Sequence, residues 1–329
     1  MPPWIAAQLG SLLAQPGHAL LLQGPSGLGQ YRLALELARA RLCEHPSAAG
    51  ACGQCPSCHA IDVRTHADLC VLMPETHMLA LEWPLDEKTQ AELDDKKRKP
   101  SREIRVDAMR DAIEFAQRTS ARGRGKAVLV FPADQMNAVT ANALLKTLEE
   151  PPGDVRFFLA TESAHQLLPT IRSRCMAHSM LWPEPAQAAA WLLAQGMDAT
   201  QLDTLLAAAG GRPEDALAMA GRGVTAAQWE AFPRAMVRGE VAFVKDWSAP
   251  QLLDALHKLC HDALAGQQGA AARFFSAKAL SALGKADAAR LSGWSVALRR
   301  AQRTVEHPFH AGLVQEALVE QAQSALHSV

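Results

Sequence analysis

The amino-acid sequence predicts an α/β domain with a mostly parallel sheet, followed by an all-helical region. Over about the first 180 residues, short apolar runs bounded by glycine and proline alternate with helical patterns, which is typical of parallel sheets. The segment Trp182-Pro183-Glu184-Pro185 then interrupts the chain. Beyond it the apolar residues recur at helical spacing, and no strand is evident.

Three apolar runs predict the buried strands of the first region: Ala19–Leu22, Ala127–Phe131 and Val155–Ala160. Apolar residues at steps of three and four predict helices between them, namely Leu33, Leu37 and Ala40, and later Ala141, Leu144, Leu145 and Leu148. Because strands and helices alternate, the strands are expected to pair in parallel.

The second region is predicted to hold two helical domains. Alanine-rich helices around Trp191 and Leu205 end at the interruption Gly210-Gly211-Arg212-Pro213, and longer helices follow from about Val224. The clearest apolar seam comprises Leu291, Trp294, Leu298, Ala301 and Val305. We therefore expect three domains, 1–182, 183–222 and 223–329, in a chain long enough for two or three.

Composition excludes several classes of protein. The 33 basic and 34 acidic residues give a formal net charge of −1, so no global field draws the chain to nucleic acid or to an anionic membrane. No apolar run approaches the ~20 residues that span a bilayer. The start Met1-Pro2-Pro3-Trp4 lacks a signal segment, so we expect a cytoplasmic, reduced protein without membrane contact.

The stretch from Asp86 to Arg105 has an uneven charge distribution. Acidic residues precede a basic run that comprises Lys96, Lys97, Arg98, Lys99, Arg102 and Arg105. Few apolar residues anchor this stretch, so it is interpreted as an exposed insertion. A solvated loop is the simpler interpretation, and a patch that contacts phosphates is the alternative.

The segment Gly24-Pro25-Ser26-Gly27-Leu28-Gly29-Gln30-Tyr31 has the strand–GxxxxGK[ST]–helix arrangement of a phosphate-binding loop. Gln30 replaces the lysine that neutralises the terminal phosphates, and Tyr31 replaces the hydroxyl residue that holds magnesium. The central strand also runs into Phe131-Pro132 where an ATPase places its acidic residues, and Asp134 comes later. We therefore expect no ATP hydrolysis and no tight ATP binding. The loop then serves as a structural turn or holds phosphate weakly.

Four cysteines lie within sixteen residues, at Cys43, Cys52, Cys55 and Cys58. Their C-x8-C-x2-C-x2-C spacing and four thiolates favour a tetrahedral, structural zinc ion with no open position for water. An iron–sulfur cluster is the rival interpretation. His59 and His66 are substitute-ligand candidates, whereas Cys70, Cys175 and Cys260 are expected to be core thiols.

Several motifs resemble the delta-prime subunits of bacterial DNA polymerase III clamp loaders, a family of the AAA+ superfamily. The segment from Asn142 to Pro152 resembles the clamp-loader signature, Phe157–Thr161 the sensor-one strand, and Ser173-Arg174-Cys175 the SRC motif. The cysteine insertion is similar to that of the bacterial subunits, as is His307-Pro308-Phe309 ahead of Leu313 and Glu316.

The resemblance implies an AAA+ P-loop core with a zinc-binding insertion at 43–58, a small helical lid and an all-α collar that joins a ring of five. It implies a non-hydrolysing subunit of the DNA-directed DNA polymerase holoenzyme that helps load the sliding clamp onto primed DNA. The implied partners are the gamma/tau motor subunits, the delta subunit and the clamp. A family sensor-two arginine would fall near Glu214, with Arg212 beside it.

By the same resemblance, Arg174 is the residue with a role in chemistry. A guanidinium that projects into a neighbour's site can stabilise the transferring phosphoryl group, as an arginine finger in trans. Arg172 is the local competitor. Lys146, Glu149 and Glu150 lie off the apolar stripe of their helix and are candidates for subunit contacts.

Two other functions stay open from the sequence. An autonomous AAA+ ATPase would need Gln30 to substitute for lysine. A zinc-bearing nucleic-acid adapter would combine the cysteine insertion with the basic run that ends at Arg105, and its binding would fall steeply with salt.

Overall fold

The chain divides into two compact units, Met1–Glu184 and Pro185–Val329. The computed structural model describes residues 1–284, 287–305 and 310–327. The boundary between the units falls within the Trp182–Pro185 break that the sequence indicates. His307-Pro308-Phe309, part of the predicted family pattern, lies outside the described residues.

The first unit is built on a five-stranded sheet in the order β2-β3-β4-β1-β5, in which every neighbouring pair is parallel. Its strands are β1 (Ala19–Gln23), β2 (Leu69–Leu72), β3 (Lys126–Val130), β4 (Val155–Thr161) and β5 (Met176–Ser179). Its helices are α1 (Pro3–Leu13), α2 (Gln30–Leu42), α3 (Pro56–Asp62), α4 (Glu75–Ala80), α5 (Glu87–Asp94), α6 (Val106–Gln117), α7 (Ala138–Glu149) and α8 (Pro169–Arg172). Short 3₁₀ helices occupy Ala133–Gln135 and Ala164–Gln166.

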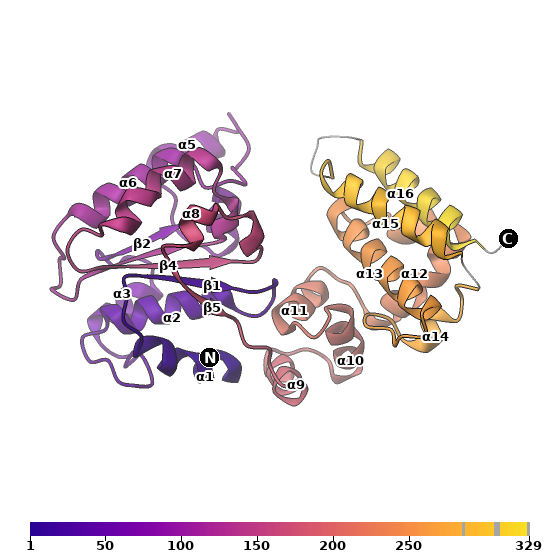
Figure 1. Ribbon diagram of the computed structural model, residues 1–329, viewed down its shortest axis with the longest axis horizontal. Coiled ribbons are helices and arrows are strands. Elements are labelled where there is room, and N and C mark those ends of the chain that lie inside the picture. The colour runs from indigo at the N-terminus through magenta and orange to yellow at the C-terminus, as the bar shows by residue number, and fades with distance from the viewer. Residues whose placement is uncertain (285–286, 306–309, 328–329) are drawn as a thin grey trace. The chain divides into compact units, whose positions relative to one another are not determined.

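The helices cover both faces of this sheet. Helices α1 and α2 lie on one face, and α6, α7 and α8 lie on the other (Figure 1). The predicted parallel α/β class is thus confirmed, and the three predicted strands correspond to β1, β3 and β4. The sequence analysis missed β2 and β5, which are the two edge strands and are only four residues long.

The register of the sheet sets where the site lies. β1 pairs with β4 from Ala19 opposite Phe157 to Gln23 opposite Thr161. Since parallel strands end at the same edge, the phosphate-loop-like turn after β1 lies beside the ends of β3 and β4. Ligands of open parallel sheets usually bind at this carboxyl edge.

Every regular element among the described residues of the second unit is helical, which confirms that region of the predicted fold. Its helices are α9 (Pro185–Ala194), α10 (Ala199–Ala208), α11 (Pro213–Gly221), α12 (Ala226–Arg238), α13 (Ala249–Gln267), α14 (Ala277–Leu280), α15 (Ala288–Gln302) and α16 (Ala311–Leu326), with a 3₁₀ helix at Val241–Val244.

The helical unit has one connected hydrophobic core, whose members run from Leu192 to Leu326. At its centre the Trp229 ring stacks on Phe275, with the ring centroids 4.6 Å apart. The predicted seam is confirmed for Leu291, Trp294 and Leu298, which are buried in α15. Ala301 and Val305 are partly buried against the same core, and Val305 lies beyond the end of the helix. The division of this unit into a lid and a collar at residue 222 stays a prediction.

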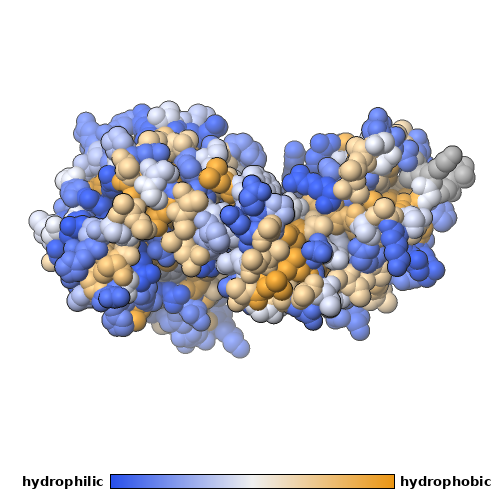
Figure 2. Space-filling model, turned by 90° about the horizontal axis from the view of Figure 1, so that it is seen from below, coloured by the Kyte–Doolittle hydropathy of each residue, from blue (hydrophilic) through white to orange (hydrophobic). Residues whose placement is uncertain are grey.

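Helix α9 presents an apolar surface, shown in orange in Figure 2. Leu193 exposes 48% of its surface there, and the other exposed positions of the helix are mostly alanine. Within the described part of the chain, no helix is both long and apolar enough to cross a membrane.

Candidate functional site

The turn between β1 and α2 has the backbone course of a phosphate-binding loop. Gly27 and Gly29 adopt φ values of +77° and +89°, a conformation that favours glycine because it lacks a Cβ atom. Gly29 is the residue before the first turn of α2. Leu28 is fully buried, and its carbonyl accepts a 2.9 Å hydrogen bond from the indole N–H of Trp4. This anchor holds the turn against α1.

The side chain of Gln30 turns back onto the backbone of this loop. Gln30 is 2% exposed, and its Nε2 donates hydrogen bonds of 2.7 Å to the carbonyl oxygens of Gly24 and Pro25. The side chain that replaces the lysine therefore closes the turn on itself and supplies no cation.

Tyr31 is likewise bound within the protein. The indole N–H of Trp83 donates a 2.6 Å hydrogen bond to the Tyr31 hydroxyl, and the tyrosine ring lies 5.4 Å from that of Phe131. Burial raises the pKa of Tyr31 and outweighs the opposing effect of the Trp83 hydrogen bond. The phenol therefore stays neutral and is held away from the role of a magnesium ligand.

The end of β3 carries no carboxylate at the position that the ATPase pattern requires. Phe131 follows the strand directly and is buried. Asp134 is the next acidic residue, and its Oδ1 accepts hydrogen bonds from the Thr161 hydroxyl and, at 3.1 Å, from the Glu162 backbone N–H. Asp134 thus ties the end of β4 to the loop after β3.

The four cysteines of the insertion come together. The sulfur atoms of Cys43, Cys52, Cys55 and Cys58 all lie within 4.8 Å of one another. The Sγ atoms of Cys43 and Cys55 are 3.8 Å apart. Four sulfurs at about 2.3 Å from a zinc ion in a regular tetrahedron are about 3.8 Å apart, so the cluster has the dimensions of a tetrahedral thiolate site.

Local structure brings these sulfurs together. Cys55 precedes the first turn of α3, where Pro56 starts the helix, and its Sγ accepts a 3.4 Å hydrogen bond from the Cys58 backbone N–H. The Cys52 backbone N–H donates to Cys43 Sγ at 3.2 Å. Gly53 has a φ of +74°, which allows the tight turn between Cys52 and Cys55. Donors that point at sulfur stabilise thiolates.

The four thiols differ in the direction of their pKa shifts. For Cys55, burial raises the pKa, but hydrogen bonds from the backbone N–H groups of Glu44 and Cys58 outweigh it and lower the pKa to about 6. Burial and the neighbouring Cys55 raise the pKa of Cys58 to about 12. A bound divalent cation would remove this conflict, because it favours every thiolate at once.

The other sulfur and imidazole candidates lie outside the cluster. Burial raises the pKa of Cys70 and of Cys175 to about 12, and that of Cys260 to about 11, so these are unreactive thiols. His59 is exposed. His66 is buried, and its Nδ1 accepts from the Asp68 backbone N–H at 3.0 Å.

The predicted signature helix is α7, which Asn137 caps through its side chain. Ala141, Leu144 and Leu148 are buried and Leu145 is partly buried, as the apolar stripe predicts. Lys146, Glu149 and Glu150 are exposed. Of these three side chains, that of Glu149 contacts Arg174.

Arg174 is held at the surface by α7 and α8. Its Nε donates a 2.6 Å hydrogen bond to Glu149, a second guanidinium nitrogen contacts the same carboxylate, and a third donates at 2.9 Å to the Thr170 carbonyl. The Arg174 side chain remains 31% exposed. The side chain of Arg172, the local competitor, is exposed and forms no hydrogen bond or ion pair among the described residues.

Comparison with known proteins adds to this geometry. A protein-family model described as "DNA polymerase III, delta subunit" matches residues 11–181, which is just over half of the chain. The chain belongs to this family. The resemblance inferred from the motifs between Asn142 and Cys175 is thereby confirmed.

The similar curated proteins include delta-prime subunits of DNA polymerase III. The chain is 42% identical to that of Pseudomonas aeruginosa over 68% of this chain and 62% of the relative. It is 36% identical to that of Escherichia coli over 66% of this chain and 60% of the relative. The DNA polymerase III subunit tau of Salmonella typhimurium is 34% identical over 51% of this chain and 22% of its own length. The chain thus matches about three fifths of the length of these delta-prime relatives.

The predicted sensor-two position near Glu214 falls at the start of α11 in this member of the DNA polymerase III delta-prime family. Arg212 immediately precedes the helix, and its Nε donates a 2.7 Å hydrogen bond to Asp215. The Arg212 side chain is 17% exposed. This ion pair ties Arg212 to the first turn of α11.

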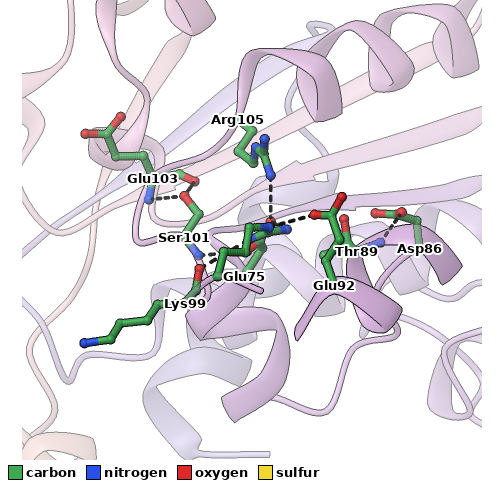
Figure 3. Close-up of polar contacts among 9 residues, drawn as sticks. Glu75, Asp86, Thr89, Glu92, Lys99, Ser101, Glu103 and Arg105 are labelled. Carbon is green, nitrogen blue, oxygen red and sulfur yellow. Dashed lines mark hydrogen bonds and ion pairs between the residues drawn. The ribbon is translucent and has the colours of Figure 1, made fainter. Parts of the chain in front are cut away.

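The charged stretch from Asp86 to Arg105 differs from the predicted solvated loop. Residues 87–94 form α5, capped by Asp86, and Arg98 forms hydrogen bonds of 2.8 Å with both Glu75 and Glu92. Glu75 is buried and also accepts from the Ser101 backbone N–H at 2.8 Å and from Arg105 at 3.4 Å (Figure 3). Lys96, Lys97 and Lys99 remain exposed. Arg98 and Arg105 therefore neutralise a buried carboxylate, and Arg98 makes the closer contacts.

Sequence reasoning missed Trp83, Glu75 and Glu149 as partners of the site residues. Trp83 is 52 residues from Tyr31, Glu75 is 23 from Arg98 and Glu149 is 25 from Arg174. No local spacing pattern marks contacts at such separations. The only available signal was that Glu149 lies off the apolar stripe of its helix.

Proposed function

We propose that this chain is a clamp-loader subunit that does not hydrolyse ATP itself. In this proposal it joins motor subunits of the gamma/tau kind and a delta subunit in a ring of five, and the ring places a sliding clamp on primed DNA. The observation that carries the proposal is the buried Gln30 amide, which occupies the phosphate turn through its bonds to Gly24 and Pro25. Family membership supports the context.

The proposal also assigns an arginine finger to Arg174, acting on the ATP of a neighbouring subunit. To reach that ATP, Arg174 must leave Glu149, and an exposed ion pair of this kind is worth about 0–1 kcal/mol. An arginine finger accelerates phosphoryl transfer about 10³–10⁵-fold, or about 4–7 kcal/mol. The lowering of the reaction barrier exceeds the energy of the ion pair, so Glu149 can hold Arg174 in a defined position without preventing its contact with the neighbouring ATP.

The cysteine cluster is proposed to hold a structural zinc ion. The 3.8 Å separation of two sulfurs and the donors aimed at them support this assignment. With four protein ligands the ion has no position for water, so it would contribute to folding and not to catalysis. Glu44 supports the insertion nearby, since it accepts 2.8 Å and 3.1 Å hydrogen bonds from the Ser57 hydroxyl and from Arg122.

The helical unit is proposed to provide the lid, over 183–222, and the collar, over 223–329. The apolar surface of α9 supports a role in an assembly, because exposed apolar patches commonly become buried in interfaces.

The deciding experiment measures ATP hydrolysis, stimulated by clamp and primed DNA, in a complex reconstituted with the motor and delta subunits. Arg174→Ala is expected to lower ATP turnover by at least the part of the total rate that the adjoining ATPase site contributes. Arg172→Ala is expected to leave ATP turnover unchanged. Both variants must first assemble as the wild type does. Unchanged turnover with Arg174→Ala in an intact complex would remove the finger assignment, and ATP hydrolysis by the isolated chain would overturn the non-hydrolysing role.

A further inference from the structure

A hollow lies at the end of the sheet opposite to the phosphate-loop-like turn. It has a volume of about 380 Å³ and forms where α1 and α2 end and where β3 and β4 begin. Leu13, Leu37 and Phe158 supply apolar walls. These residues come from three separate elements, so no local motif marks the hollow.

Three arginines, Arg41, Arg124 and Arg156, also line this hollow. Asp154 forms an ion pair with Arg41 and is itself 71% exposed. Arg124 and Arg156 form no ion pair within residues 1–284, 287–305 and 310–327. Three guanidiniums against one carboxylate leave an excess of two positive charges in one concavity.

The donors of these arginines are not all used. The Nε atoms of Arg41 and Arg124 are buried and have no hydrogen-bond partner. Burial lowers the pKa of Arg156, the charge of Arg41 lowers it further, and the charge of Asp154 opposes both effects only in part. Buried donors without partners cost free energy, and like charges at close range add to that cost. An anion in the hollow would remove both costs.

We propose that Arg41, Arg124 and Arg156 form a binding site for a phosphate group. A phosphate monoester carries close to two negative charges on three acceptor oxygens, which matches the excess charge better than a single carboxylate does. Arginine forks bind such oxygens in pairs. A hollow suits a terminal phosphate, from either a small phosphorylated compound or the 5′ end of a nucleic-acid strand. The proposal is independent of the arginine-finger assignment.

The competing role for these arginines is structural. The hollow lies where α1 and α2 end, and cations near the carboxyl ends of helices offset the partial negative charge there. In that case their removal would lower stability without any effect on an anion. The two roles therefore differ in a binding measurement.

The test is calorimetric titration of the full chain with inorganic pyrophosphate at constant ionic strength, for wild type, Arg124→Gln, Arg156→Gln and the matched control Arg110→Gln. Arg110 is exposed on α6, so it loses the same charge elsewhere. Saturable binding is expected in wild type and in Arg110→Gln. Loss of charge-assisted hydrogen bonds should weaken binding at least about tenfold in Arg124→Gln and Arg156→Gln.

Competition identifies the source of the phosphate. Displacement of pyrophosphate by a 5′-phosphorylated oligonucleotide, but not by the unphosphorylated strand, supports the site with a nucleic-acid end as its ligand. Displacement by neither strand supports the site with a small phosphorylated compound as its ligand.

Equal affinity in all four proteins would overturn the proposal, as would binding of a glutamate-rich peptide in place of pyrophosphate. If both arginine variants fail to fold, thermal unfolding of the wild type in the presence of pyrophosphate tests the proposal. A site that binds only the folded state must raise its melting temperature as pyrophosphate is added, and no rise overturns the proposal.

Discussion

Replacement of Gln30 by alanine tests whether this side chain closes the phosphate turn. The substitution removes two 2.7 Å hydrogen bonds from a residue that is 2% exposed. Each such bond contributes about 0.5–1.5 kcal/mol net, and the lost methylene adds about 0.8 kcal/mol. The Gly24 and Pro25 carbonyls lie on a partly exposed turn and can form hydrogen bonds with water in the variant, which favours the lower end of the summed energy range. We expect the free energy of unfolding to fall by about 2–3 kcal/mol.

The assay is urea unfolding of the full chain, with Gln117→Ala as the matched control because Gln117 is exposed. The same samples are titrated with magnesium ATP. Neither wild type nor Gln30→Lys is expected to hydrolyse ATP alone, since Tyr31 remains bonded to Trp83 and Phe131 remains at the end of β3. A loss of stability below about 0.5 kcal/mol would refute the structural role of Gln30, given the bond energies above. ATP turnover by Gln30→Lys would show that the lysine alone was missing.

Two further predictions concern the metal site and the charged stretch. Metal analysis is expected to find zinc bound to the purified chain, and Cys58→Ser or a chelator should remove the zinc and lower the melting temperature. The affinity for zinc should fall as pH falls, because thiolates take up protons. Full zinc occupancy in Cys58→Ser would contradict the four-thiolate site. Burial raises the pKa of Glu75, but hydrogen bonds from Arg98 and from the Ser101 N–H outweigh burial and hold the pKa below the usual 4.5. The ionised Glu75 carboxylate therefore stabilises the fold at neutral pH, and this stabilisation is lost as the pH falls below 4.5. Glu75→Gln should therefore lower the free energy of unfolding by about 1–3 kcal/mol at pH 7, and the urea midpoint should then depend less on pH in the acid range. The control Glu87→Gln, at an exposed residue, should leave the pH dependence unchanged. An unaltered pH dependence in Glu75→Gln would show that Glu75 is not the responsible group.

The sequence by itself determined those features that depend on local pattern. Apolar runs located β1, β3 and β4, and alternating steps located the seam of α15 around Trp294. The cysteine spacing selected the four thiols that the fold brings together, because x2 spacings already place neighbouring sulfurs close. The replacements at Gln30 and Tyr31 could be recognised because the loop pattern around them is intact.

Only the tertiary structure decided which partner each of these side chains has. Gln30 bonds to its own loop, Tyr31 meets Trp83 from a distant segment, and Glu149 holds Arg174. The edge strands β2 and β5 are too short to carry a periodic signal, and their pairing comes from the neighbouring strands. The arginine-lined hollow is assembled from residues far apart in the sequence. Periodicity records which face of an element is buried, whereas these contacts depend on how separate elements pack, and that is set by the whole fold.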